Sequence, residues 1–282
     1  MQPFPAFIIV ASLGLLIPPA RTQDVSQVQL ENVLHPEVRA REIRVAVLPI
    51  GSTEPHANHM PYGSDTFASG ALAARAALKA NQLGAKVIVM PTMPYGINTN
   101  VVAIPYAQCL RPATLTQVVK DVVDGLERHG IRKVLILNGH GGNTTTLGAA
   151  LRELFASHRK VFVALIDASG PANDQLSKLG MAPGEHASEA ETSVGLALFP
   201  EKIRMERAVA PREAPLKLKS LQAGYISFVR PWDRVSDNTG MGDPTRATAE
   251  KGRKLVEVFV DRVAALLKEL SDAELTESFP YD

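Results

Sequence analysis

The sequence predicts an α/β fold in which helices cover both faces of a mainly parallel sheet. Short apolar runs that are typical of buried strands alternate along the chain with longer runs of helical composition or spacing. The connections between them are short, which favours right-handed crossovers. No internal repeat, linker or change of composition divides the chain. These observations indicate a three-layer α/β/α arrangement in a single domain.

The strand and helix patterns follow one another in a regular order. The expected strands are residues 44–50, 86–90, 133–137 and 161–166. The expected helices are residues 65–80, 115–129 and 144–157, a short helix that ends at residue 198, and residues 247–270. The first helix is rich in alanine, the second has apolar residues at helical spacing, and Gly84 and Gly130 are suitable helix ends.

Three segments do not match a long helix or a strand. Residues 25–41 are polar with scattered apolar positions, which indicates an arm or a short helix. Residues 94–112 form a long, turn-rich loop, and a long loop in a compact domain is usually functional. Residues 201–243 are irregular and contain the only tryptophan, Trp232. We expect residues 98–111 and the region around residues 225–232 to shape the binding pocket, or the pocket of a neighbouring subunit.

Composition excludes several classes of function. The formal net charge is +1, and no lysine and arginine cluster is interleaved with aromatic residues, so we expect no nucleic-acid partner. Cys109 is the only cysteine, which excludes an intramolecular disulfide and a cysteine-based metal site. The apolar fraction of 45% and charged fraction of 21% are typical of a soluble globular protein.

The N-terminal segment resembles a signal peptide. Residues 7–17 form an apolar run of suitable length that is too short to span a membrane comfortably, and a possible cleavage region follows. No lysine or arginine precedes the run. We predict a signal peptide over residues 1–23, one domain over residues 24–282, and a periplasmic or secreted protein without a membrane partner after cleavage. A cytoplasmic protein with an N-terminal strand or buried arm is the alternative.

The stretch after the first strand carries candidate metal ligands. Glu54 and His56 are two residues apart, so in an extended segment their side chains point to the same side. Asp65 lies where the loop meets the first helix, and ligands bind at the carboxyl ends of strands in open α/β sheets. Two carboxylates and an imidazole suit a divalent zinc, manganese or iron ion. Alone, Asp65 is equally well explained as a helix N-cap.

Two later segments add further candidates. His140 follows the third strand within Asn138-Gly-His-Gly-Gly-Asn143, whose glycines allow a tight turn close to a ligand and whose asparagines are expected to fix that turn by hydrogen bonding. His186, Glu189 and Glu191 precede a short helix. Parallel strands end at one edge of a sheet, so these groups can meet the first set. Alone, Glu191 is better explained as part of a capping box with Ser188.

Together the three motifs strongly resemble those of the creatininase (creatinine amidohydrolase) family. The matching pattern is Glu54-x-His56 followed by Asp65, then Asn138-Gly-His140-Gly-Gly-Asn143, then His186-Ala-Ser-Glu-Ala-Glu191. The resemblance extends over about residues 45–270. It implies a three-layer α/β fold, two divalent metal ions (Zn²⁺, Mn²⁺ or both, with Fe²⁺ as a further choice) and a homo-oligomer, often a hexamer.

The resemblance also implies a role for each matching residue. Glu54 and His140 would bind one metal, His56 and Glu191 the other, and Asp65 would bridge both. His186 would carry protons or hold the substrate, with Glu189 as a second candidate proton donor. Gly141, Gly142 and Tyr95 are placed at the substrate.

Departures from the family pattern bear on the substrate. Creatininase itself has Tyr-Glu where this chain has Gly141 and Gly142, and it has a tryptophan shortly before the position of His186. Creatinine is therefore not the expected substrate. We predict metal-dependent hydrolysis of another non-peptide amide, cyclic or linear, on a small molecule. A formamide deformylase or a peptidase using the same site is one alternative, and a non-catalytic metal-binding protein is another.

Overall fold

A computed structural model describes residues 24–157 and 160–281. The predicted signal peptide lies outside the described residues. None of the described helices has the length and apolarity that a membrane crossing requires.

The described chain alternates strands and helices. The strands are β1 (Val45–Ile50), β2 (Val87–Val89), β3 (Lys133–Asn138) and β4 (Phe162–Asp167). The main helices are α2 (Ser64–Gln82), α3 (Pro112–Arg128), α4 (Thr144–Ser157), α5 (Glu189–Leu198) and α8 (Ala249–Asp272). Shorter helices are α1 (His35–Ala40), α6 (Lys219–Gln222), α7 (Trp232–Val235) and the 3₁₀ turns η1 (Ser26–Val28), η2 (Leu30–Asn32), η3 (Gly141–Asn143), η4 (Gly170–Gln175), η5 (Pro200–Lys202) and η6 (Met205–Arg207).

The four described strands form one parallel sheet in the order β2-β1-β3-β4. The chain enters at β1, adds β2 on one side, and then crosses to β3 and β4 on the other. Ile50 pairs with Asn138, and Asn138 pairs with Asp167, so the carboxyl ends of β1, β3 and β4 stand in one row. The loops that leave this row are therefore neighbours, although they are far apart in sequence.

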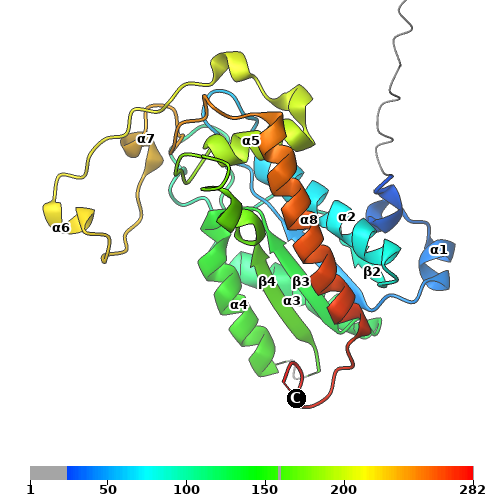
Figure 1. Ribbon diagram of the computed structural model, residues 1–282. Coiled ribbons are helices and arrows are strands. Elements are labelled where there is room, and N and C mark those ends of the chain that lie inside the picture. The colour runs from blue at the N-terminus through cyan, green and yellow to red at the C-terminus, as the bar shows by residue number, and fades with distance from the viewer. Residues whose placement is uncertain (1–23, 158–159, 282) are drawn as a thin grey trace, which may run out of the picture.

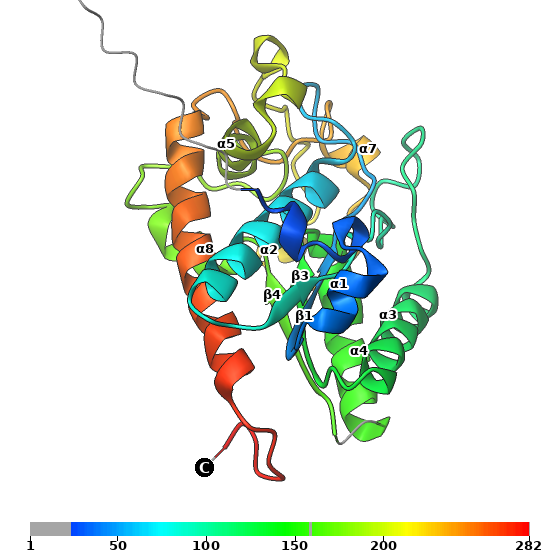
Figure 2. The same cartoon turned by 90° about the vertical axis from the view of Figure 1, so that its right-hand side faces the viewer.

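Helices cover both faces of the sheet (Figures 1 and 2). Alternate strand residues such as Val45 and Leu135 pack with α2 and α8, where the alanines of α2 allow close packing. The intervening residues, such as Ala46 and Ile136, pack with α3 and α4. This confirms the predicted three-layer α/β/α fold with a parallel sheet.

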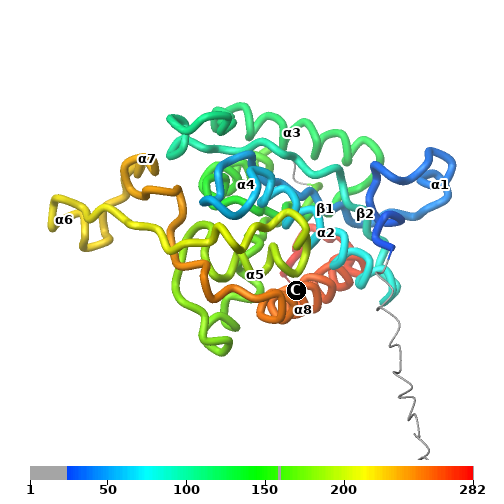
Figure 3. Tube along the Cα trace, turned by 90° about the horizontal axis from the view of Figure 1, so that it is seen from above, coloured from blue at the N-terminus to red at the C-terminus, as the bar shows by residue number. Residues whose placement is uncertain are grey.

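Most predicted boundaries agree with the structure within a few residues. Gly84 and Gly130 follow the ends of α2 and α3 with φ of +89° and +81°, a conformation that glycine adopts without strain. The segment between α5 and α8 contains only 3₁₀ turns and the short helices α6 and α7, and its part around α6 extends away from the body (Figure 3). Residues 25–41 contain η1, η2 and α1, as the arm-or-short-helix prediction allowed.

Candidate metal centre

The loop between β1 and α2 carries three of the predicted ligands. Gly51 lets this loop pass over the start of α2, because a Cβ at residue 51 would lie 2.5 Å from the backbone nitrogen of Thr66. Glu54 and His56 follow in the loop, and Asp65 lies in the first turn of α2. All three side chains are buried. Burial of two carboxylates at one place requires compensating positive charge.

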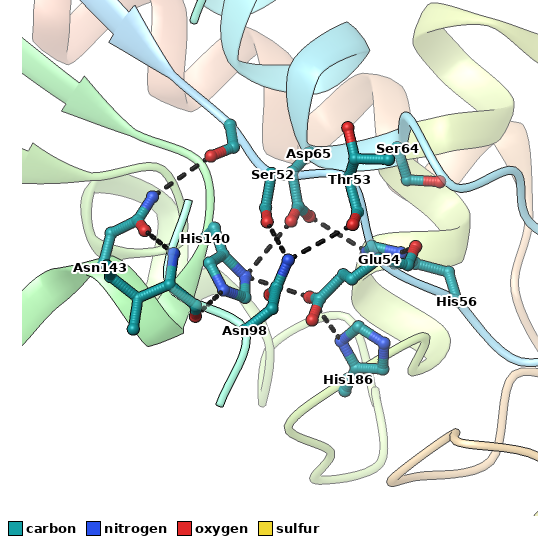
Figure 4. A network of polar contacts seen from close by, with 12 residues as sticks. Ser52, Thr53, Glu54, His56, Ser64, Asp65, Asn98, His140, Asn143 and His186 are labelled. Carbon is teal, nitrogen blue, oxygen red and sulfur yellow. Dashed lines mark hydrogen bonds and ion pairs between the residues drawn. The ribbon is translucent and has the colours of Figure 1, made fainter. Parts of the chain in front are cut away.

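His140 lies just beyond β3 in a turn held by the side chains of Asn138 and Asn143, of which Figure 4 shows Asn143. Asn138 donates to the carbonyl of His140 at 2.8 Å, and its Oδ1 accepts from the backbone nitrogen of His140. Asn143 donates to the carbonyl of Gly51 at 3.1 Å and accepts from the backbone nitrogen of Ile97 at 2.8 Å. These bonds tie the turn to the loops after β1 and β2, which confirms the predicted role of both asparagines.

His186 is held in place by the segment that precedes α8. The backbone nitrogen of Met241 donates to the carbonyl of His186 at 2.8 Å, and an antiparallel bridge joins the two residues. Ala187 has a φ of +47°, which is uncommon for a residue with a Cβ. Its N–H donates to Oε2 of Glu191 at 2.6 Å. The turn thus positions both the ring of His186 and the carboxylate of Glu191.

Each of the three histidines has one ring nitrogen bonded to a backbone carbonyl. The pairs are Nδ1 of His56 with Glu54 at 3.1 Å, Nε2 of His140 with Ile97 at 2.9 Å and Nε2 of His186 with Pro55 at 2.8 Å. A carbonyl oxygen only accepts, so these nitrogens carry the hydrogens. In a neutral ring the other nitrogen then presents a lone pair, the arrangement in which metal-binding histidines are held.

The remaining ring nitrogens all face carboxylate oxygens (Figure 4). Nε2 of His56 lies 3.0 Å from Oδ1 of Asp65. Nδ1 of His140 lies 2.9 Å from Oε1 of Glu54 and 3.2 Å from Oδ2 of Asp65. Nδ1 of His186 lies 3.6 Å from Oε1 of Glu54. Lone pairs and carboxylate oxygens repel at these distances unless a proton or a cation lies between them.

Three of the carboxylate oxygens lack hydrogen-bond partners. Both side-chain oxygens of Glu54 and Oδ2 of Asp65 are buried and accept no hydrogen bond from the described residues. Two groups of ligand atoms, Glu54 with His56 and His186, and Glu54 with Asp65 and His140, each lie within 4.8 Å of one another. Mixed imidazole and carboxylate donors suit zinc, manganese or iron. The residues therefore fit a binuclear metal site in which Glu54 belongs to both groups and Asp65 faces both His56 and His140.

The pKa values of the buried groups also indicate that positive charge is favoured at this place. Burial alone would lower the pKa of His56, but Asp65 and Glu54 outweigh burial and raise this pKa to about 10. His140 follows the same pattern, with a pKa well above its ordinary value because of Glu54 and Asp65. Burial raises the pKa of Glu191 to about 7. Without a metal, protons on the histidines would balance the buried carboxylates.

Asn98, in the loop after β2, supports the centre and was not identified from the sequence. Its side chain is fully buried and donates to Oγ of Ser52 at 2.6 Å, to the carbonyl of Gln108 at 2.6 Å and to that of Thr53 at 3.2 Å. The loop that was predicted to be functional is thus fastened to the segment that carries Glu54. No local pattern distinguishes Asn98 from any other loop asparagine.

A cavity of about 450 Å³ opens beside the centre, a volume typical of small-molecule sites. His56, Asp65, His140, Gly141 and Glu191 line one side of it. Apolar side chains from α2, α5 and α8 line much of the remainder, among them Leu72, Val194, Leu255 and Phe259. A small molecule with an apolar part can therefore lie next to the metal ligands.

Comparison with known proteins decides the family. The model of a family described as creatininase, creatinine amidohydrolase, matches residues 31–267. The chain belongs to the creatininase family. A mycofactocin precursor peptide peptidase of Mycobacterium tuberculosis is 31% identical over 222 residues, 76% of this chain and 81% of the peptidase. Creatinine amidohydrolase of Pseudomonas putida is 28% identical over 242 residues, 80% of this chain and 89% of that enzyme.

The chain is also similar to a hydrolase named for a different substrate and to two solved structures. A 3-dehydro-scyllo-inosose hydrolase of Thermotoga maritima is 28% identical over 254 residues, 83% of this chain and 80% of the hydrolase. The crystal structure of a candidate creatinine amidohydrolase from Bacteroides fragilis superposes with a TM-score of 0.81 at 31% identity, over 89% of this chain and 99% of that chain. A manganese creatininase structure superposes with a TM-score of 0.71 at 28% identity, over 87% and 99%.

Two residues assigned to the site of this creatininase-family chain lie elsewhere. Oε2 of Glu189 accepts from the backbone nitrogen of Ala182 at 2.9 Å, and Oε1 forms an ion pair with Lys251 of α8. Both oxygens are therefore engaged outside the metal centre, which gives no support to Glu189 as a proton donor. Tyr95 is half-exposed and does not line the cavity. Its neighbour Gly96 packs against the site instead.

The two capping interpretations are also resolved. The N-cap of α2 is Gly63, so Asp65 lies inside the helix and its carboxylate is free to face the histidines. Ser188 is the N-cap of α5 but makes no side-chain capping bond, and Glu191 accepts from Ala187 rather than from Ser188. The expected capping box is therefore not formed, although Glu191 does bond a backbone N–H at the helix start.

Trp232 reaches the centre from α7, about 50 residues after the stretch that lacks a tryptophan. Its ring lies 4.3 Å from the ring of His186, centre to centre, and the ring of His186 lies 4.2 Å from that of His56. Trp232 is absent from the cavity lining, so it supports His186 from behind. The sequence indicated only that the segment containing Trp232 shapes the pocket.

The space around Gly142 and Gly141 differs, so alanine at each position gives a matched pair of variants that tests the role of His140. A Cβ at Gly142 would lie 2.4 Å from Nε2 of His140 and 2.2 Å from the carbonyl of Ile97, the two partners of one hydrogen bond. A Cβ at Gly141 meets nothing within 4 Å. Replacing Gly142 by alanine is expected to turn His140 and lower metal affinity by about 10- to 100-fold. Replacing Gly141 by alanine should leave metal affinity unchanged.

Titration with Mn²⁺ or Zn²⁺ measures both affinities. Neither glycine has a positive φ, so alanine brings no backbone strain at either position. Equal metal affinity of the two variants would show that the bond between His140 and Ile97 does not orient a metal ligand.

Proposed function

We propose that this protein is a metal-dependent hydrolase that cleaves a non-peptide amide bond, cyclic or linear, in a small molecule. The observation that carries the proposal is the set of three buried imidazoles whose second ring nitrogens face carboxylate oxygens of Glu54 and Asp65. Among these oxygens, those of Glu54 and Oδ2 of Asp65 lack hydrogen bonds. This donor set lies in the wall of a cavity of small-molecule size.

The metal ligands in this proposal are Glu54, His56, Asp65, His140 and Glu191. Bound divalent cations lower the pKa of water to near neutrality and polarise a carbonyl group, which is the chemistry that amide hydrolysis requires. The chain contributes the geometry: the carbonyls of Glu54 and Ile97 fix the hydrogens on the rings of His56 and His140, so that each ligand nitrogen is already aimed.

His186 is the candidate for proton transfer. In the metal-free protein, burial and then the positive charge of His56 lower the pKa of His186 to about 4. Its Nε2–H donates to the carbonyl of Pro55, which leaves Nδ1 to accept a proton and pass it to a leaving nitrogen. The same nitrogen is within reach of a metal bound by Glu54, so a ligand role competes with proton transfer.

The size and walls of the cavity favour a small amide. About 450 Å³ holds a compact molecule, and apolar side chains cover much of the cavity wall. The residues just before His186, from Met181 to Glu185, offer no aromatic surface for a flat ring. Trp232 does not line the cavity either, which argues against creatinine itself.

A peptidase is the second candidate, because a family member that is 31% identical is a mycofactocin precursor peptide peptidase. A formamide deformylase would use the same site. Protein loaded with Mn²⁺ or Zn²⁺ should be tested for amine release from matched lactams, formamides, linear acetamides and short peptides. We expect turnover of non-peptide amides. Cleavage of peptides alone would replace the proposal by the peptidase, and two bound metals without any turnover would indicate a non-catalytic metal-binding protein.

A further inference from the structure

Asp167, the last residue of β4, is a carboxylate that the proposed reaction does not use. It pairs with Asn138 across the sheet, and Asn138 precedes the His140 turn by two residues. Neighbouring strands are about 4.8 Å apart. Asp167 and His140 line the same cavity. Asp167 is therefore close to the metal ligands without being one of them.

One oxygen of Asp167 is fixed and the other is free. Oδ1 accepts hydrogen bonds from Nδ2 of Asn138 at 2.7 Å and from Oγ1 of Thr144 at 3.0 Å. Within the described part of the chain, no group donates to Oδ2. The two donors hold the carboxylate in one orientation at the cavity wall, so the unused oxygen needs no reorganisation to accept from a ligand.

Outside the metal centre, the charged side chains that line the cavity are acidic. Among the described residues that line it, none is lysine or arginine. Asp65 and Glu191 belong to the metal centre, and Glu185 forms an ion pair with Arg230. Among the lining carboxylates, Asp167 is thus the one that is neither a proposed metal ligand nor paired with a basic side chain. A carboxylate at the remote end of a substrate, placed beside Asp167 and away from the metal centre, would meet repulsion from Asp167.

We propose that Asp167 selects the substrate: it binds an ammonium, guanidinium or other N–H donor on the part of the amide remote from the scissile bond. The apolar wall formed by residues such as Leu72, Leu255 and Phe259 takes the connecting hydrocarbon. Amides with a carboxylate at the remote end are excluded. This inference rests on the proposed function, since it assigns the chemical class of the substrate of the same site.

Three acetamides of matched length test the charge preference. They are N-(4-aminobutyl)acetamide, N-pentylacetamide and 4-acetamidobutanoate, which end in an ammonium, a methyl and a carboxylate group. Their binding to the metal-loaded protein is measured by calorimetry, and amine release is followed separately. We expect the ammonium compound to bind at least about tenfold more tightly than the neutral one, because hydrogen bonds to charged groups contribute more than neutral ones. The carboxylate compound should bind most weakly.

Replacing Asp167 by asparagine tests the residue itself. Asparagine keeps an oxygen for Asn138 and Thr144 and removes the charge. The ammonium preference should then fall to within about twofold of the neutral compound. Replacing Asp121, an exposed residue of α3, by asparagine changes the net charge equally and should leave the preference intact.

The outcomes separate the two proposals. Binding in the expected order without hydrolysis would support the selection by Asp167 and count against amide hydrolysis. Equal binding of the three compounds, no detectable binding of the ammonium compound, or an unchanged preference in the Asp167→Asn variant would overturn the selection, whether or not the amides are hydrolysed.

Discussion

Replacing Asp65 by asparagine is expected to lower kcat/KM by about 10³-fold or more and to prevent full metal loading. Asp65 faces His56 with one oxygen at 3.0 Å and His140 with the other at 3.2 Å. Asparagine has the same shape but no charge, so a bridging anionic ligand is lost together with several kcal/mol of metal-dependent stabilisation. Metal content by mass spectrometry and steady-state kinetics measure the effect.

The metal-free variant should remain folded. In the metal-free protein asparagine removes the buried ion pairs of Asp65 with His56 and His140, so the variant's free energy of unfolding should be lower than that of the metal-free wild type, by about 1 to 3 kcal/mol. The exposed Asp121→Asn variant serves as the control for the change of charge. A variant of Asp65 that binds two metals and retains full activity would show that the centre has been assigned wrongly.

Removing the metals is expected to destabilise the protein by about 4 kcal/mol for each ion lost, under conditions where the free metal concentration is a thousand times the Kd of its site. In a domain of this size each ion then contributes about 10 °C to Tm. The physical reason is that Glu54 and Asp65 keep buried oxygens without hydrogen bonds once the cations have left. Thermal unfolding before and after dialysis against a chelator, followed by addition of Mn²⁺ or Zn²⁺, measures the change.

The same experiment with the Asp65→Asn variant separates specific from general metal effects. Its Tm should respond much less to Mn²⁺ or Zn²⁺, because part of the ligand set is missing. If the wild type unfolds at the same temperature with and without metal, the cations do not occupy the buried cluster.

The sequence predicted the layers of the fold and the residues that meet at the centre. Apolar runs such as Val45–Ile50 can lie only in a buried strand, and parallel strands end at one edge, so Glu54 and His140 had to approach one another. The structure brings Glu54, His56, Asp65, His140 and His186 within contact of one another. Their individual roles remain predictions.

The motif around His186 did not reveal which of its two acidic residues faces the centre. Glu189 and Glu191 are both in the first turn of α5, and residues two apart on a helix point in nearly opposite directions. Which side of the helix each glutamate faces depends on the residue at which the helix starts. Helix boundaries are the least reliable part of a prediction from sequence. Glu191 accepts from Ala187 and shares the cavity with His56, whereas Glu189 turns to Lys251.

Contacts between distant residues of long loops could not be predicted from the sequence either. Asn98 and Trp232 lie in irregular segments, where neither helical nor strand spacing predicts the direction of a side chain. Their positions depend on distant partners, Gln108 and Ser52 for Asn98 and His186 for Trp232. Such contacts become visible only when the three loops at the sheet edge are assembled.

Anomalous X-ray diffraction from crystals loaded with Mn²⁺ or Zn²⁺ tests the central claim most directly. We expect two anomalous peaks in contact with Glu54, His56, Asp65 and His140, at the edge where β1 and β3 end. The account would be contradicted if crystals of fully active protein gave anomalous peaks only elsewhere in the molecule, or no peak between these side chains.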